Sequence, residues 1–118
     1  MKKLQITASS NVGLVRTNNE DMILVRNKYV RDEDYDTEID LSVCDRLVVA
    51  VADGMGGYEA GEVASQEALS SLHFFVSDLP EKISDEDFNE AIVGWINSIN
   101  KTINSQGRND DAYRNMGT

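Results

Sequence analysis

Two short segments place acidic residues where an apolar run meets a loop. Glu20 and Asp21 directly precede the apolar run at residues 22–25, and Asp53 directly follows the run at residues 47–52. Burying a lone carboxylate is very costly, so Asp53 must be exposed at a strand end, hydrogen-bonded to the turn or bound to a cation. Strand ends are also where rigid scaffolds present functional residues. These acids are therefore candidate ligands for a metal ion.

Glycines dominate the segment at residues 53–57, which reads Asp-Gly-Met-Gly-Gly. They let the backbone turn sharply and bring carbonyl oxygens close to a ligand. A carboxylate beside a carbonyl is hard-oxygen chemistry suited to Mg²⁺ or Mn²⁺. A dinucleotide-binding pattern beginning at Gly54 would lack its third glycine. A P-loop beginning at Gly56 would have Glu62 and Val63 where lysine and a hydroxyl residue are required, so we expect no nucleotide binding by either route.

A second acidic cluster has the spacing of a calcium-binding loop. The ligands at the first, third and fifth positions of an EF-hand would be Asp32, Asp34 and Asp36. That pattern also requires glycine and glutamate where the chain has Thr37 and Val43. We therefore interpret residues 32–40 as a solvated acidic loop.

The composition narrows the classes of protein. The chain has 118 residues, of which 11 are basic and 21 acidic, and its net charge of −10 repels nucleic acid and anionic membranes. No apolar run reaches the roughly 18 residues of a membrane span, and no apolar stretch typical of a signal peptide follows the N-terminal lysines. Cys44 is the single cysteine, which fits a reducing compartment. We expect a cytoplasmic protein with no nucleic-acid or membrane partner.

Apolar runs predict the strands that would present the acids. We expect short strands at residues 4–7, 22–25 and 47–52. The last run, Leu-Val-Val-Ala-Val-Ala, is typical of a strand buried on both faces. About three strands are few, because most sheets have about 4–6. The sequence therefore looks like part of a larger domain.

Two long helices are predicted after the strands. The first spans residues 59–79 and ends before Pro80. Its apolar stripe comprises Ala64, Ala68, Leu69, Leu72, Phe75, Val76 and Leu79. The second begins at the N-cap Ser84 and fades near Gly107. Its stripe, which we expect to be buried, comprises Phe88, Ile92, Trp95, Ile99 and Ile103. His73, the single histidine, is interpreted as structural or exposed.

Three motifs occur in one order along the whole chain. The first covers residues 10–16 (Ser-Asn-Val-Gly-Leu-Val-Arg) and 19–21 (Asn-Glu-Asp), and the second covers residues 51–57. A small-residue helix start follows at residues 60–65, and residues 115–118 (Asn-Met-Gly-Thr) resemble the start of a third motif. Together they resemble the type-2C (PPM) family of metal-dependent serine/threonine protein phosphatases. Many eukaryotic members have histidine after the Asp-Gly, whereas the methionine found here resembles the bacterial type.

The resemblance implies a fold that the chain contains only in part. The fold class would be α+β, part of an α-β-β-α sandwich in which antiparallel sheets are flanked by helix pairs, incomplete at its C-terminal side. Residues 1–118 would form the N-terminal part of one truncated catalytic domain.

The resemblance also implies a role for each site residue. Asp53 would bridge two divalent ions, Mn²⁺ or Mg²⁺, and Gly54 would offer its backbone carbonyl to one of them. Glu20 and Asp21 would lie at the same metal, mostly through water. Arg16 would hold the substrate phosphate, because a guanidinium makes bidentate contacts with phosphate. The ions would lower the pKa of a shared water, and the resulting hydroxide would attack the phosphorus of a phosphoserine or phosphothreonine.

Family members are longer than this chain and supply further aspartates outside it. The resemblance therefore implies a phosphatase activity of the parent protein on phosphorylated proteins, opposing a serine/threonine kinase. We expect the fragment itself to bind metal weakly, to be inactive or nearly so, and to self-associate through exposed apolar surface. The alternative is a non-catalytic regulatory or partner-binding module with a phosphatase-like fold.

Overall fold

The computed structural model describes residues 2–56, 60–113 and 115–118, which form two antiparallel sheets and two long helices. The strands are β1 (Lys3–Ser9), β2 (Asp21–Val25), β3 (Lys28–Val30), β4 (Asp34–Asp40) and β5 (Val49–Asp53). The helices are α1 (Ala60–Asp78), α2 (Asp85–Asn109) and the short 3-10 helix η1 (Asp111–Tyr113). β1 pairs with β4 in one sheet, and β2 lies between β3 and β5 in the other.

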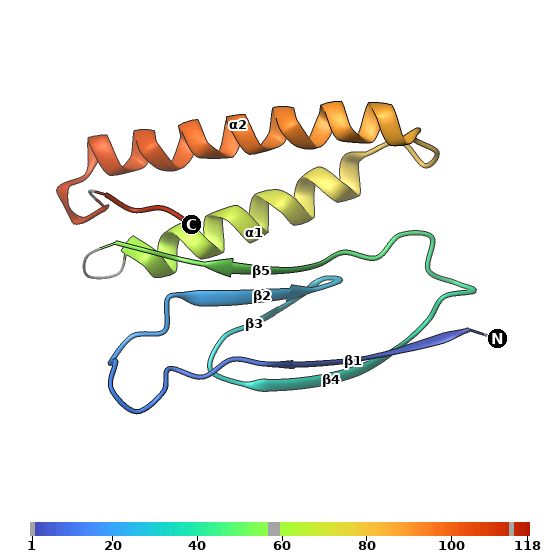
Figure 1. Ribbon diagram of the computed structural model, residues 1–118, viewed down its shortest axis with the longest axis horizontal. Helices are drawn as coiled ribbons and strands as arrows, with labels where there is room; N and C mark the ends of the chain where they lie inside the picture. Colours follow the sequence, from blue (N-terminus) through green and yellow to red (C-terminus); the bar gives the residue numbers. More distant parts are fainter. Residues whose placement is uncertain (1, 57–59, 114) are drawn as a thin grey trace.

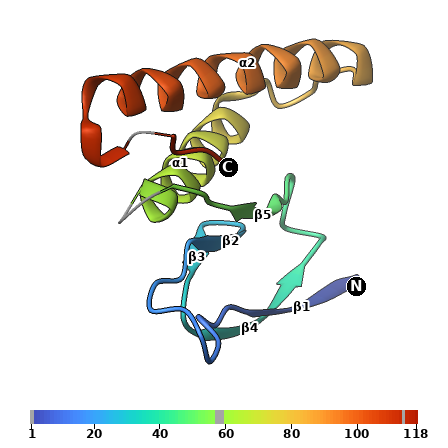
Figure 2. The ribbon, with the colours of Figure 1, turned by 60° about the vertical axis from the view of Figure 1, so that its left-hand side comes forward.

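These elements are stacked in layers (Figure 1). α2 lies over α1, α1 lies over the three-stranded sheet, and that sheet lies over the β1–β4 pair. Figure 2 shows the same order from another side. This arrangement confirms the predicted α+β class and is consistent with part of the predicted sandwich. No helix among the described residues is long and apolar enough to cross a bilayer.

Three apolar clusters hold the layers together. The cluster between α1 and the three-stranded sheet comprises Met22, Leu24, Ala52 and Leu69. The cluster between the two sheets comprises Ala8, Val25 and Val30. The cluster that joins α1, α2 and the C-terminal segment comprises Ala60, Ala64, Ala68, Ile103 and Met116. β2 contributes to both sheet clusters because successive side chains of a strand point to opposite faces.

The prediction of a loop at residues 32–40 is wrong, because most of this segment forms β4. Tyr35, Thr37 and Ile39 are partly or fully buried, whereas Asp36 and Glu38 between them are exposed. This alternation is the pattern of a strand with one covered face. β3 is also absent from the sequence-based prediction, so five strands are described where about three were expected.

The prediction that β5 is buried on both faces is also wrong. Ala52 is buried toward α1, whereas Val49 and Val51 are 51% and 71% exposed. Val51 shares its face with Ile23, its register partner on β2. The β1–β4 pair covers that face of β2, but nothing among the described residues covers it on β5.

α1 begins and ends close to the predicted residues. It ends at Asp78, just before Pro80. The expected start at Glu59 lies outside the described residues, as does Gly57 of the glycine-rich segment. His73 is half-buried on α1, and its ring makes an edge contact with Tyr29.

The start of α2 confirms the predicted N-cap. The Ser84 hydroxyl oxygen accepts a hydrogen bond of 3.1 Å from the Asp87 N–H. The predicted stripe lies on the covered side of the helix but is fully buried only at Ile103: Ile92 and Ile99 are partly buried, and Phe88 is 37% exposed. Trp95 is half-buried and donates to the Ser71 hydroxyl at 2.8 Å.

Candidate metal and phosphate site

Two aspartates face each other where β2 begins and β5 ends. The strands are antiparallel, and Asp21 and Asp53 are register partners. Partners on neighbouring strands present their side chains on the same face. Because the next pair, Met22 and Ala52, packs toward α1, the two aspartates lie on the opposite face of the sheet.

A cavity of about 250 Å³ opens at this end of the sheet. Its lining comprises Asn11, Val12, Arg16, Asn18, Asn19, Glu20, Asp21, Asp53 and Gly54. Every residue predicted for the metal and phosphate site is in this set. The β-sheet and the loop between β1 and β2 therefore bring those residues together, and their individual roles stay predictions.

The charges in this cavity are unbalanced toward the negative. Partial burial and a hydrogen bond with Asp53 raise the pKa of the Asp21 carboxyl. The negative charges of Asp53 and Glu20 raise this pKa further, and the Arg16 cation opposes them. Two carboxylates repel each other unless a proton or another cation lies between them. The cavity therefore favours a bound cation.

The donor atoms suit a hard divalent cation. Carboxylate and carbonyl oxygens are the ligands that Mg²⁺ and Mn²⁺ prefer. Within the described ranges, no group of three or more His, Cys, Asp or Glu residues is arranged so that it could hold a metal ion. The residues present therefore fit one side of a divalent-ion site and do not complete it.

Two glycines allow close packing beneath the acids. The Gly54 N–H donates to the Glu20 carbonyl oxygen at 3.1 Å. A Cβ at Gly54 would clash with the Gly61 carbonyl oxygen and lie 2.6 Å from that of Glu20. A Cβ at Gly61 would clash with the Glu20 carboxylate. Glu20 thus lies against the first turn of α1, where the helix dipole favours negative charge.

Comparison with known proteins gives several relatives over nearly the whole chain. Protein phosphatase PhpP of Streptococcus pneumoniae is 32% identical over 115 residues, which are 98% of this chain and 40% of PhpP. The putative protein phosphatase 2C-type of Streptococcus pyogenes is 31% identical over 121 residues, again 98% of this chain and 40% of the relative. Serine/threonine protein phosphatase PstP of Mycobacterium tuberculosis is 30% identical over 98% of this chain and 18% of PstP.

Over nearly its whole length the chain is therefore similar to part of bacterial proteins that are named as type-2C or serine/threonine protein phosphatases. It spans about two fifths of the length of PhpP and a smaller share of PstP. No family profile matches the chain, and no solved structure matches it significantly.

Sequence reasoning missed the structural role of Asn19 in the candidate site. Asn19 is 7% exposed. Its amide nitrogen donates to the Ser10 hydroxyl at 2.8 Å and to the Asp32 carboxylate at 3.0 Å. Its amide oxygen accepts the Asp21 N–H at 3.1 Å. Asn19 therefore holds the loop after β1, the turn before β4 and the start of β2 in one arrangement.

Arg31 is a second positioning residue that the sequence did not reveal. Its Nε donates to the Asp21 carbonyl oxygen at 3.0 Å. Its Nη2 donates to the Glu62 carbonyl oxygen at 3.1 Å and to the Ser65 hydroxyl at 2.6 Å. One guanidinium thus joins the first residue of β2 to the first turns of α1. A single arginine after a short strand gives no sequence signal for such a link.

Proposed function

We propose that the parent protein of this chain hydrolyses phosphoserine and phosphothreonine on proteins with the help of Mn²⁺ or Mg²⁺. The observation that carries the proposal is the pairing of Asp21 with Asp53 in a cavity that also contains Arg16. The names of PhpP and PstP as protein phosphatases support it. A cytoplasmic location and an opposing serine/threonine kinase belong to the same proposal.

The chain's own residues would divide the work between cation and phosphate. Asp53, Asp21, Glu20 and the Gly54 carbonyl would hold the ions. When bound, such ions lower the pKa of a water molecule, which supplies the nucleophile. Arg16 is exposed at the cavity, so its guanidinium can bind two phosphate oxygens and offset their charge.

The leaving alcohol needs a proton. Met55 stands where many eukaryotic members have histidine, and a methionine side chain cannot donate one. Met55 is 60% exposed, and its backbone pairs with Gly117 through hydrogen bonds of 2.8 and 2.9 Å. Its side chain is not among the residues that line the acidic cavity. We therefore propose that water delivers this proton.

We further propose that the 118-residue chain has little or no activity of its own. Its carboxylates fit one side of a divalent-ion site. A site with only a few protein ligands rarely displaces the water molecules bound to Mg²⁺. This proposal would be contradicted if the isolated chain hydrolysed a phosphothreonine peptide as fast as the longer parent protein does.

The proposed activity is tested by a phosphatase assay with Mn²⁺. The protein assayed is the parent protein, which carries this chain and has a length similar to that of its relatives. We expect hydrolysis of a phosphothreonine peptide, and we expect Asp53→Asn to lower kcat at least about 100-fold because the bridging ligand is lost. Asp36→Asn, the same change on the exposed face of β4, serves as the matched control. Absence of activity in the unsubstituted protein would favour the alternative, a non-catalytic partner-binding module.

A further inference from the structure

The loop between β1 and β2 exposes two apolar side chains next to Arg16, the proposed phosphate ligand. Leu14 is 105% exposed and Val15 is 94% exposed, which are the two highest fractions among the large apolar residues that the structure describes. Single exposed apolar residues are common on protein surfaces. Here two adjacent ones directly precede Arg16, so they leave apolar surface in water at the edge of the acidic cavity, where a bound substrate can cover it.

A second cavity connects Val15 with the acidic site. This Val15 cavity has a volume of about 370 Å³, and its lining comprises Val15, Arg16, Thr17, Asn18 and Glu20. Arg16, Asn18 and Glu20 also line the acidic cavity. The two cavities therefore adjoin at these three residues, and Val15 lines only the second one.

The loop that carries the two apolar residues is held at its base. The Asn19 amide closes this base through its 2.8 Å hydrogen bond to the Ser10 hydroxyl. The Asn11 side-chain oxygen accepts the Gly13 N–H at 2.7 Å. Gly13 has a φ of 83°, in the region that favours glycine, and begins the turn at residues 13–15. These features limit the conformations open to the loop and keep its tip beside the site.

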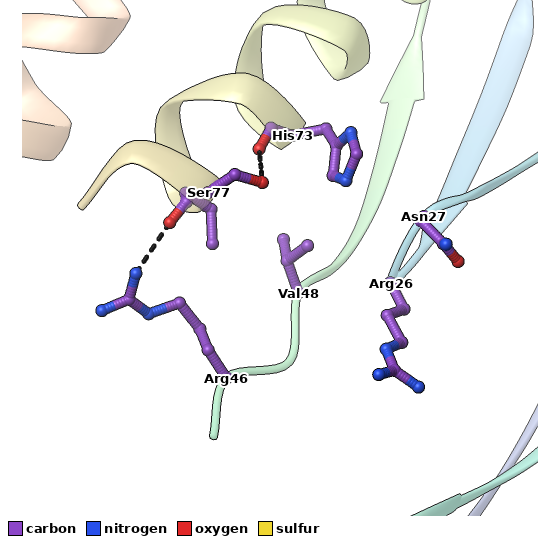
Figure 3. Close-up of a pocket in the computed structure, with 7 residues that line it drawn as sticks. Arg26, Asn27, Arg46, Val48, His73 and Ser77 are labelled. Carbon is purple, nitrogen blue, oxygen red and sulfur yellow. Dashed lines mark hydrogen bonds between the residues drawn. The ribbon is translucent and has the colours of Figure 1, made fainter. Parts of the chain in front are cut away.

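The cavity at the opposite end of β2 and β5 has no comparable grouping of side chains (Figure 3). Arg46 donates to the Val76 carbonyl oxygen at 2.8 Å and so caps the end of α1. The side chains of Arg26 and Asn27 point away from His73. The polar groups of that cavity therefore do not converge on one ligand, whereas Val15 and Arg16 line the same cavity.

We propose that Leu14 and Val15 form a subsite for an apolar side chain of the phosphorylated substrate, one or two residues from the phosphoserine or phosphothreonine. This inference rests on the proposed function and narrows its substrate class. The Cα atoms of Val15 and Arg16 are about 3.8 Å apart, and an extended peptide advances about 3.3 Å per residue. With the phosphate at Arg16, a side chain one or two residues away therefore reaches the Val15 cavity. Its burial there removes apolar surface from water on both partners.

The test measures kcat and KM of the parent protein with Mn²⁺ on a set of phosphothreonine peptides. Each peptide has leucine at one of the two positions before or the two positions after the phosphothreonine, and serine at the other three. A peptide with serine at all four positions is the reference. We expect leucine in at least one position to raise kcat/KM about three- to tenfold. The gain should come from a lower KM, because a contact remote from the phosphorus binds substrate and transition state alike.

Three variants of the parent protein assign this preference to Val15. Val15→Ser should remove most of it by raising KM for the preferred leucine peptide. Val15→Leu should retain the preference, because the apolar surface remains. Val43→Ser, at a residue 78% exposed in the loop before β5, is the matched control and should also retain it.

Two kinds of failure are distinguishable. Equal kcat/KM for all peptides, an unchanged leucine preference in Val15→Ser, or an equal loss in Val43→Ser would overturn the subsite and leave the phosphatase function standing. If the unsubstituted protein hydrolysed none of the peptides and no p-nitrophenyl phosphate, the proposed function itself would be overturned, and the subsite with it.

Discussion

At the scale of single residues, Asp21 and Asp53 show how a site is built at a cost in stability. They lie directly opposite each other on antiparallel strands, where like charges repel. Arg16 opposes part of this repulsion but makes no hydrogen bond to either among the described residues. The metal-free protein therefore keeps a local strain that a divalent cation would relieve.

Removing one of the two charges should stabilise the metal-free chain. We expect Asp21→Asn to raise the free energy of unfolding at pH 7 by up to about 1 kcal/mol, since solvent screens exposed carboxylates. Folding raises the pKa of Asp21 above its ordinary 3.8. The destabilisation by the Asp21 charge is therefore absent below about pH 3.8 and grows as the pH rises through the folded-state pKa.

Urea unfolding in EDTA at low salt measures this difference across pH. Asp36→Asn, on the exposed face of β4, is the matched control and should change the stability by less than about 0.5 kcal/mol. An equal gain in both variants would assign the effect to net charge instead of to the pair.

Asn19 should matter for the opposite reason, because its buried amide satisfies groups on three segments. We expect Asn19→Ala to lower the free energy of unfolding by about 2 kcal/mol, because the Asp21 N–H and the Ser10 hydroxyl lose their partner. Urea unfolding provides the measurement. Asn18→Ala, next to it and exposed, should have a much smaller effect. Equal losses of unfolding free energy in the two variants would show that Asn19 has no positioning role.

The sequence could supply the site residues but not their supports. Arg16, Glu20, Asp21, Asp53 and Gly54 all belong to local motifs, and the structure gathers them in one cavity. All but one of the hydrogen-bond partners of Asn19 and Arg31 lie 9 to 34 positions away in the sequence. Such links depend on the packing of β2 against α1, which no local pattern contains.

At the scale of elements, the helices were easier to predict than the strands. Helix starts depend on local groups, and the Ser84 cap is found as predicted. β4 was missed because seven acids between Asp32 and Asp45 suggested a loop. The informative signal was the alternation of acidic residues with Tyr35, Thr37 and Ile39. The apolar run of β5 predicted burial on both faces, but burial also depends on which segments cover a strand.

The N-cap of α2 allows a direct test at this scale. We expect Ser84→Ala to lower the free energy of unfolding by about 1 kcal/mol, because the Asp87 N–H loses its acceptor. The urea midpoint is the measurement. Ser98→Ala, an exposed position inside the same helix, should be neutral or slightly stabilising since alanine is the better helix former. A cap variant as stable as this control would show that the bond contributes nothing.

At the scale of the whole molecule, apolar side chains remain exposed on two layers. Val49 and Val51 lie on the uncovered face of β5, and Val93 and Ile96 are 57% and 51% exposed on α2. Exposed apolar patches and exposed strands promote association. The chain spans about two fifths of PhpP. We expect these exposed apolar surfaces to affect whether the isolated chain self-associates.

We expect the isolated chain to self-associate as its concentration rises, and Val51→Lys to weaken this at least several-fold because it places a charge on the exposed face of β5. Sedimentation velocity across concentrations measures the association. Val43→Lys, at a residue 78% exposed in the loop before β5, is the matched control. A monomer at all concentrations, or equal effects of the two lysines, would contradict a role for this face.

The most direct test of the proposed metal site is Mn²⁺ binding by the chain itself, followed through the electron paramagnetic resonance signal of the free ion. The proposed incomplete site predicts weak binding, with a Kd of about 1 mM. Asp53→Asn should weaken it at least about tenfold, whereas Asp36→Asn should leave it unchanged. Equal Mn²⁺ affinity in the two variants would contradict a metal site built on Asp53.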